Sequence, residues 1–429
     1  GLPLMGTAGI TYGAVDFVNT YKEFEYEMAN VKALTGATDE NFLKLNKRAK
    51  ELGATTIFKA SEVAKAEGYM ALAGWNAEKI YSGLPAVLNL SAAAGEDLAR
   101  VSDIVTDSMT GFGIEAGKMV RNANGQMVDT STHFSDVMAM LMSKSNTTVG
   151  MAGEAAKYSA GGIGALYKSQ SDEDKMRAYE DWALFTGLMA NSGIKSSMAG
   201  TATRSLFTRL ASQQMNASAA MQGMGISTTY TESDIAKEIQ QNGVASHQVG
   251  QTRRARDIIG DIRKTFQDGI EPEQMLQLAE DLGGKTFTKQ QRKKLSSVLA
   301  NAQKNGGVMS DADKATVTNL LAGQEALAGW LSVLMASEKD WKSLADNIDN
   351  ADGAADKMSK IKMDTLEGDI KTLGSAWEAF QLELMGGEDG KGAAASGLRS
   401  LLQGLTEDVR YFQNAIKDGF DIGDMIASL

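Results

Sequence analysis

Histidine is the side chain that most often supplies catalytic proton transfer and metal binding, and the chain contains two of them. His133 and His247 lie more than a hundred positions apart, and neither has a second His three or four positions away. A zinc site would need carboxylate partners that nothing in the sequence designates. No Gly-x-Ser-x-Gly elbow accompanies a His-based triad. The chain also has no Cys, which excludes disulfides, thiolate metal sites and Cys nucleophiles.

Two further runs resemble ligand-binding loops in part. The Gly-Gly-Lys-Thr run at 283–286 imitates the end of a phosphate loop, but Ala279 stands where that motif has its first Gly. The Asn350–Gly353 run is similar to part of a calcium loop, which needs an acidic residue first and a Glu twelfth. Ile348 and Ser359 occupy those two positions. We therefore expect no catalytic residue, no metal site and no cofactor, and we assign the many Asp and Glu residues to solvated helix faces.

The elements that would position these residues are predicted to be helices. Only 3 of the 429 residues are Pro, and Pro disrupts a helix interior by about 3 kcal/mol. Ala, Met, Leu, Lys, Gln and Glu, which are good helix formers, are plentiful. No run shows the strict alternation of a strand, so the sequence predicts an all-α fold without a sheet. The net charge of −11 argues against specific nucleic-acid binding.

Between residues 49 and 115 the sequence pattern predicts several short helices. A helix ends near Leu52 with Gly53 as its stop, and Ser61 and Asn76 are expected to cap the next two. Pro85 is expected in the first turn of another helix, which Gly95 ends. These frequent stops predict a compact N-terminal domain in place of one straight rod.

The helix that follows Gly95 has one apolar stripe, and Trp75 in the preceding AGWN turn is expected to pack in the same core. The stripe residues recur at spacings of three and four: Leu98, Val101, Val105, Met109 and Phe112.

A second stripe, near residues 361–385, steps by 4, 3, 4, 3 and 4, which is the a/d spacing of a coiled coil. Its residues are Leu366, Ile370, Leu373, Trp377, Phe380 and Leu384. One interpretation is a helix that packs on its own domain. The other is a short self-associating coiled coil, with a trimer favoured and a hexamer as the alternative. Gly368 and Gly374 weaken this helix by roughly 1 kcal/mol each.

Changes in composition predict four parts. Residues 1–224 form the core helical domain, 225–309 a more polar helical insert or linker, 310–386 a second helical block, and 387–429 a flexible Gly/Ala segment followed by C-terminal helices. The apolar run at 4–15 is shorter than the ~20 residues of a membrane span, and we interpret it as a buried helix. The chain has no recognisable signal peptide, and it opens on Gly, so we expect it to be processed or to be part of something longer.

Two blocks of the sequence resemble the core region of phage tail tape measure proteins. The first covers about 17–210 and the second about 323–384, in the family's order. The runs that carry the resemblance are FEYEMANVKALTG (24–36), ELGATTIFKASEVAKA (51–66), MALAGW (70–75), LPAVLNLSAAAGEDL (84–98), GIKSSMAGTATRSLFTRL (193–210), NADGAADKM (350–358) and DTLEGDIKTLGSAWEAF (364–380). Residues 225–320 show no such resemblance.

The resemblance implies a helical, non-enzymatic structural protein of the virion. Members of this family assemble in the bacterial cytoplasm, occupy the tail lumen and tip, set tail length and are released when DNA is ejected. The implied partners are tail assembly chaperones, the tail tube protein, tail tip or baseplate hub proteins, further copies of the chain, and the host inner membrane during ejection. The alternatives are a membrane-active channel component, for which the apolar helices are short, and a cell-wall hydrolase, of which the sequence shows no sign.

Overall fold

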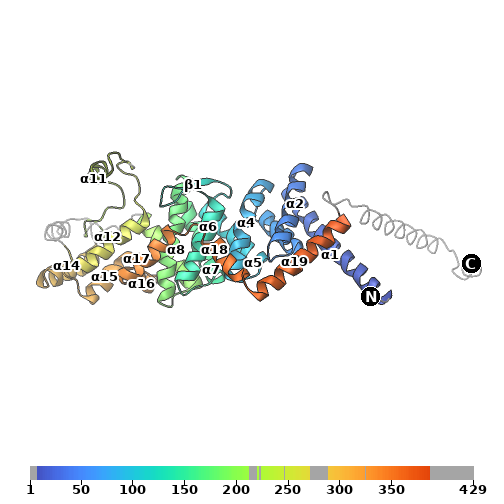
Figure 1. Ribbon diagram of the computed structural model, residues 1–429. Helices are drawn as coiled ribbons and strands as arrows, with labels where there is room; N and C mark the ends of the chain where they lie inside the picture. The colour runs from blue at the N-terminus through green and yellow to red at the C-terminus, as the bar shows by residue number, and fades with distance from the viewer. Residues whose placement is uncertain are drawn as a thin grey trace, which may run out of the picture. The chain divides into compact units, whose positions relative to one another are not determined.

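A computed structural model describes residues 7–211, 220–221, 224–245, 247–270, 288–323 and 325–386 (Figure 1). These residues are mainly helical, so the expected all-α class is confirmed. The chain divides into two compact units, which are described separately: Gly1–Tyr81 with Met363–Leu429, and Ser82–Lys362. The run at 283–286, the segment 387–429 and the side chain of Leu384 lie outside the described residues. The expected divisions at residues 224, 309 and 386 stay predictions.

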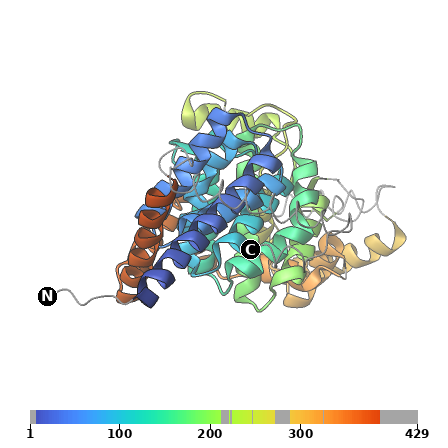
Figure 2. The ribbon, with the colours of Figure 1, turned by 90° about the vertical axis from the view of Figure 1, so that its right-hand side faces the viewer.

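Unit 1 joins the beginning of the chain to a helix from near its end. Figures 1 and 2 show α19 beside α1; α1 also contacts α3, and α19 also contacts α2 and α3. Side-chain hydrogen bonds fix this arrangement: Gln381 Nε2 donates to Asp16 at 2.7 Å and Ser375 Oγ donates to the Thr56 carbonyl at 2.6 Å. The helices are α1 (Thr7–Thr35), α2 (Asp39–Thr55), α3 (Ala60–Leu72) and α19 (Leu366–Gly386).

Gly53 does not end its helix, so that prediction was wrong. Thr38 caps the start of α2, and the helix continues through Gly53 to Thr55. A Cβ atom at Gly53 would lie 2.6–2.7 Å from Ala60, the first residue of α3. Gly53 therefore serves a close approach of two helices, which a sequence pattern does not distinguish from a helix stop.

Unit 2 contains the rest of the described helices and one hairpin. α4 (Ala77–Ala94) begins in unit 1 and continues into unit 2. The other elements are α5 (Leu98–Phe112), β1 (Met119–Arg121), β2 (Met127–Asp129), α6 (Thr130–Lys144), α7 (Val149–Leu166), α8 (Asp172–Asn191), α9 (Ser196–Ala211), α11 (Glu232–Asn242), α12 (Ala255–Asp268), α14 (Lys289–Lys304), α15 (Asp311–Ala322), α16 (Leu327–Leu334), α17 (Glu338–Asp349) and α18 (Ala354–Met363).

Local signals explain several helix ends. Asn76 Oδ1 accepts a hydrogen bond from the Lys79 amide at 3.0 Å, and α4 ends immediately before Gly95, whose φ is +70°. Asp97 then caps α5. Pro85, however, lies inside α4 and does not start a new helix, because the preceding segment is already helical and continues through it. Lys59 holds the cap position of α3 that the sequence assigned to Ser61.

Helices α5, α7 and α9 form a closely packed layer in which α7 contacts both others. Small residues permit this: a Cβ at Gly164 on α7 would lie 2.1 Å from the Gly111 carbonyl oxygen of α5. The stripe Leu98, Val101, Val105, Met109 and Phe112 is buried along α5, and Trp75 in unit 1 is 6% exposed. Phe112 packs edge-to-face on Trp182, with ring centroids 5.3 Å apart.

The expectation of no sheet was wrong in one place. β1 and β2 form a two-stranded antiparallel hairpin in which Val120 pairs with Val128. The strands are three residues long, too short for an alternating pattern to be recognised. Gly125, with a φ of +76°, lies in the turn between them. The hairpin matters for the site described next because it carries an asparagine-rich turn.

Among the described residues, no helix combines the length and the apolar character that a membrane crossing requires.

Candidate functional site

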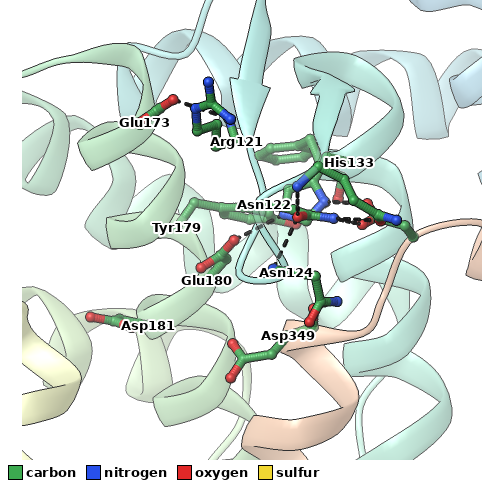
Figure 3. Close-up of polar contacts among 12 residues, drawn as sticks. Arg121, Asn122, Asn124, His133, Glu173, Tyr179, Glu180, Asp181 and Asp349 are labelled. Atoms are coloured by element: carbon green, nitrogen blue, oxygen red, sulfur yellow. Dashed lines mark hydrogen bonds and ion pairs between the residues drawn. The ribbon is translucent and has the colours of Figure 1, made fainter. Parts of the chain in front are cut away.

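A cluster of charged side chains lies in unit 2 where segments distant in sequence meet (Figure 3). Its members come from the hairpin turn, the beginning of α6, the middle of α8, the residues before and within the first turn of α12, and the α17–α18 connection. We call it the buried ion-pair network. Its residues are Asn122, Asn124, His133, Asp136, Glu180, Asp181, Arg254, Arg256, Asp349 and Asp352.

His133 forms the centre of one half of the network. Its Nδ1 lies 2.6 Å from Asp352 Oδ1 and its Nε2 lies 2.9 Å from Glu180 Oε1, and the ring is 1% exposed. Burial alone would lower the pKa of His133, but the two carboxylates outweigh burial and raise the pKa from 6.5 to about 9. The ring is therefore an imidazolium at neutral pH and donates through both nitrogens.

Glu180 connects this half to two arginines. Its second oxygen accepts a hydrogen bond from Arg254 NH2 at 2.7 Å, and Arg254 Nε donates to Asp181 Oδ1 at 2.7 Å. Burial pushes the pKa of Glu180 upward, but the bond from His133 and the charge of Arg254 hold it below its usual value. Burial raises the pKa of Asp181, and the guanidinium groups beside it oppose that rise.

Arg256 extends the network to the end of α17. Its backbone amide donates to Asp181 Oδ2 at 3.0 Å, and its Nε donates to Asp181 Oδ1 at 3.1 Å. Its NH1 donates to both oxygens of Asp349, at 2.7 and 2.9 Å. The pairs are partly or fully withdrawn from water, where removal of one partner costs about 3–5 kcal/mol. The network therefore ties α8, α12 and α17 together.

The hairpin turn holds the α17–α18 connection. Asn122 Nδ2 donates to the second oxygen of Asp352, and Asn124 Nδ2 donates to Asn350 Oδ1 at 3.1 Å. Burial favours a higher pKa for Asp352, but the hydrogen bonds from His133 and Asn122 lower it. The connection is thus bound from two sides, by the hairpin and by α6.

Asp136 on α6 fixes the start of α18. Its carboxylate accepts hydrogen bonds from the backbone amides of Gly353 at 2.8 Å and Ala355 at 2.9 Å. Burial raises the pKa of Asp136 to about 6, although the two amides favour the charged form. A side chain more than two hundred positions away in sequence therefore does for α18 what a local capping residue does for other helices.

The arrangement is suited to holding helices together. Both ring nitrogens of His133 are occupied by carboxylates, so neither can bind a metal ion or accept a proton while those bonds persist. Across the described residues, no group of three or more His, Asp or Glu side chains has a geometry that would hold a metal ion. We interpret the network as a structural joint.

The second histidine lies apart from this network. His247 Nε2 is 3.2 Å from the Tyr230 hydroxyl, the two rings stack with centroids 4.0 Å apart, and His247 Nδ1 is 2.5 Å from Glu238 Oε1. The two histidines therefore have separate partners and do not form a common site.

The heptad stripe of α19 is exposed to solvent. The exposed fractions are 76% for Leu366, 58% for Ile370, 72% for Leu373, 52% for Trp377 and 49% for Phe380. The opposite side of the helix faces unit 1, where Glu378 Oε1 accepts a hydrogen bond from the Ser61 amide at 2.8 Å. Phe17 of α1 packs on Trp377 of the stripe, with ring centroids 6.1 Å apart.

Sequence reasoning missed the network. It assigned the acidic residues to solvated faces, whereas Glu180 and Asp181 are 2% and 0% exposed. One signal was available: both lie between Tyr179 and Trp182 in an otherwise apolar part of α8. The Asn350–Gly353 run, rejected as a calcium loop, forms part of the network.

These features define an α-helical protein whose central charged cluster joins distant parts of the chain. Residues 46–284 match the family described as phage-related minor tail protein. That match covers more than half of the 429 residues, and the chain belongs to the phage-related minor tail protein family.

Two relatives extend the likeness to nearly the whole chain and confirm the resemblance to tape measure proteins. The tape measure protein of Pneumococcus phage Dp-1 is 27% identical over 381 residues, which are 89% of this chain and 26% of that protein. The probable tape measure protein of Escherichia phage P2 is 22% identical over 413 residues, 94% of this chain and 41% of that protein. The chain thus spans well under half the length of these relatives. No solved structure matches it.

Proposed function

We propose that this chain is a folded segment of a phage tail tape measure protein, and that the part which measures length lies in other sequence. The observation that carries this proposal is the combination of near-complete alignment to tape measure proteins with a chain folded back on itself. A protein that measures tail length must be extended, so that each residue adds to its length. A helix rises about 1.5 Å per residue. The longest of the described helices, α1, has 29 residues and so reaches only about 43 Å.

The segment acts as a structural part in this proposal and carries no catalytic role. It occupies the tail lumen near the tip, contacts the tube protein and the tip or baseplate hub, binds assembly chaperones before tube growth, and leaves when DNA is ejected. The buried ion-pair network supports a structural role because its charged groups bind one another. A zymogram on bacterial cell wall with the purified chain tests the non-enzymatic part, and a cleared band at its position contradicts it.

Tail length measured by electron microscopy tests the placement of the ruler. A 28-residue helical insertion after Gly243, next to the exposed Val244, adds about 42 Å if this segment is extended along the tail. We expect tails of unchanged length, because an insertion in a surface turn of a compact unit does not lengthen it. The same insertion in the part of the full-length protein outside this chain serves as the control and lengthens the tail. Longer tails from the first insertion contradict the proposal.

The exposed stripe of α19 is the surface through which copies of the chain associate in this proposal. Its a/d spacing is self-complementary, because each apolar side chain fits between those of an identical helix. Five large apolar side chains in water on one helix face are characteristic of an interaction site. A trimer is favoured, with a hexamer as the alternative.

Light scattering after gel filtration tests this association. Leu373→Asp introduces a charge in the middle of the stripe and is expected to give monomers. Thr372→Asp places the same charge at an exposed neighbouring position outside the stripe and is expected to leave the oligomer unchanged. A monomeric wild-type chain, or equal effects of the two substitutions, contradicts the role of the stripe.

A further inference from the structure

A polar pocket of about 540 Å³ in unit 2 takes no part in the network or in the α19 stripe. One wall is α9, and the other is the connection between α15 and α16. The lining residues are Thr201, Arg204, Ser205, Thr208, Arg209, Ala322, Gly323, Glu325 and Ala326. Its α9 wall belongs to the run at 193–210, one of the runs that carry the family resemblance.

The helical spacing orders these side chains into a floor and two sides. Residues advance by about 100° each around a helix, so Thr201, Ser205 and Thr208 fall within about 60° of one another. Arg204 and Arg209 flank these three hydroxyls, one on each side. The structure agrees: the stem of Arg204 lies against Gly162 of α7, where a Cβ would be 3.2 Å from Arg204 Cγ.

Arg209 leans the other way, onto the opposite wall. A Cβ at Gly323 would lie 2.7 Å from Arg209 NH2, and Gly323 has a φ of +73°. Glycine at this position therefore leaves room for the guanidinium against the loop. Ser205 Oγ reaches the Ala322 carbonyl only at 3.5 Å, a long hydrogen bond, so the hydroxyl remains available to a ligand.

The two guanidinium groups differ from those of Arg254, Arg256 and Arg263 in the same unit. Arg254 and Arg256 each bind carboxylates at 2.7 Å, and Arg263 is close to Glu338. In the part of the chain that the structure describes, neither Arg204 nor Arg209 has a carboxylate within ion-pair distance. The acidic residue of the lining, Glu325, is exposed. Two unpaired cations over a floor of hydroxyls favour an anionic ligand with oxygen acceptors.

The separation of the cations favours a peptide with two carboxylates over a single anion. Arg204 and Arg209 are five positions apart, which is about 7.5 Å along the helix axis and about 140° around it, so the two guanidinium groups lie on opposite sides of the floor. Two carboxylates of one extended peptide, whose residues rise about 3.4 Å each, can reach both sides of the floor at once, whereas a single small anion cannot. The net charge of −11 disfavours a nucleic-acid strand, whose every unit carries a charge. We propose that this pocket binds an extended acidic peptide segment of a partner protein, with one acidic residue held by Arg204 and another by Arg209.

Fluorescence anisotropy with a labelled Gly-Asp-Gly-Asp-Gly peptide tests the proposal on the whole chain. We expect Arg204→Gln and Arg209→Gln each to weaken binding by about tenfold, since each removes a charge-assisted hydrogen-bond donor. Arg177→Gln is the matched control: it removes the same charge from the same unit, from an arginine paired with Asp174. Circular dichroism confirms that each variant folds, and Arg204 is exposed, so its replacement does not disturb the core.

Thr208→Asp provides an independent variant, because it puts a negative charge on the floor and leaves both arginines in place. It is expected to weaken the peptide at least as much as Arg204→Gln. No binding by the wild-type chain, or equal weakening by Arg177→Gln, overturns the proposal. So does displacement of the peptide by inorganic phosphate or a short single-stranded oligonucleotide at equal concentration, which would identify phosphate oxygens as the ligand. None of these outcomes depends on the tape measure role or on tail length.

Discussion

His133→Gln separates the charge of the imidazolium from its place in the network. The glutamine amide retains a hydrogen-bond donor but carries no charge, so the carboxylates of Glu180 and Asp352 lose the cation between them. Removal of one partner of a buried pair costs about 3–5 kcal/mol. We expect a loss of that size in the free energy of unfolding at pH 6.

The pH dependence of this loss follows from the pKa of His133. The pKa is about 9 in the folded chain against 6.5 for the free side chain. One pKa unit corresponds to about 1.36 kcal/mol, so the charged ring contributes about 3 kcal/mol of stability. Because the folded pKa is the higher one, the contribution is complete below pH 6.5, declines from pH 6.5 to 9 and is absent above about pH 9.

Urea unfolding of the wild-type chain and of His133→Gln at pH 6, 8 and 10 measures this decline. Titrating groups outside the network affect both proteins alike and cancel in the difference, which should shrink by about 3 kcal/mol between pH 6 and pH 10. The chain has two histidines, and NMR of the imidazole carbons follows His133 once His247→Gln has identified which signal belongs to it. A difference in stability that does not change with pH, or a His133 pKa at or below 6.5, refutes the reasoning.

Three further substitutions test packing and burial. Among the described residues, neither oxygen of the fully buried Glu67 has a hydrogen-bond partner. Burial raises the pKa of Glu67 well above 4.5, so folding binds a proton and stability falls as pH rises above 4.5. Glu67→Met should therefore raise the melting temperature at pH 8 and have less effect at pH 5. Gly164→Ala on α7 should destabilise by about 1–3 kcal/mol in thermal unfolding, because its Cβ overlaps the Gly111 carbonyl. Gly161→Ala, three positions earlier with open space around it, should stabilise by about 0.5–1 kcal/mol, and an equal loss from both substitutions contradicts the packing argument.

Features encoded within a few residues were predictable from the sequence. Asn76 was correctly expected to cap α4, because its side-chain oxygen and the amide three positions further on form a local pair. Gly95 ends a helix through its positive φ, again a local property. The prediction for Gly53 was wrong because this glycine is required by the neighbouring helix α3. The sequence alone does not distinguish a glycine that permits close helix packing from one that ends a helix.

The candidate site could not be predicted because its partners are distant in sequence. In the sequence, Arg254 and Arg256 lie close together in the polar insert, and Asp349 and Asp352 were assigned to solvated helix faces. Their meaning depends on burial against α8, which only the fold provides. The tape measure resemblance was visible because it rests on runs of adjacent residues, whereas a network assembled from single residues leaves no such run.

The long reach of the contacts described above also sets an order of events during synthesis. Asp352 is made 219 residues after His133, and at about 5–20 residues per second this takes about 10–40 s. Until then the network of Glu180, Asp181 and His133 lacks Asp352, and these charged side chains must remain hydrated. Gln381, the partner of Asp16, follows 365 residues after it, so unit 1 also waits for α19. Asp352 and Gln381 leave the ribosome within seconds of each other, and the two units therefore close almost together.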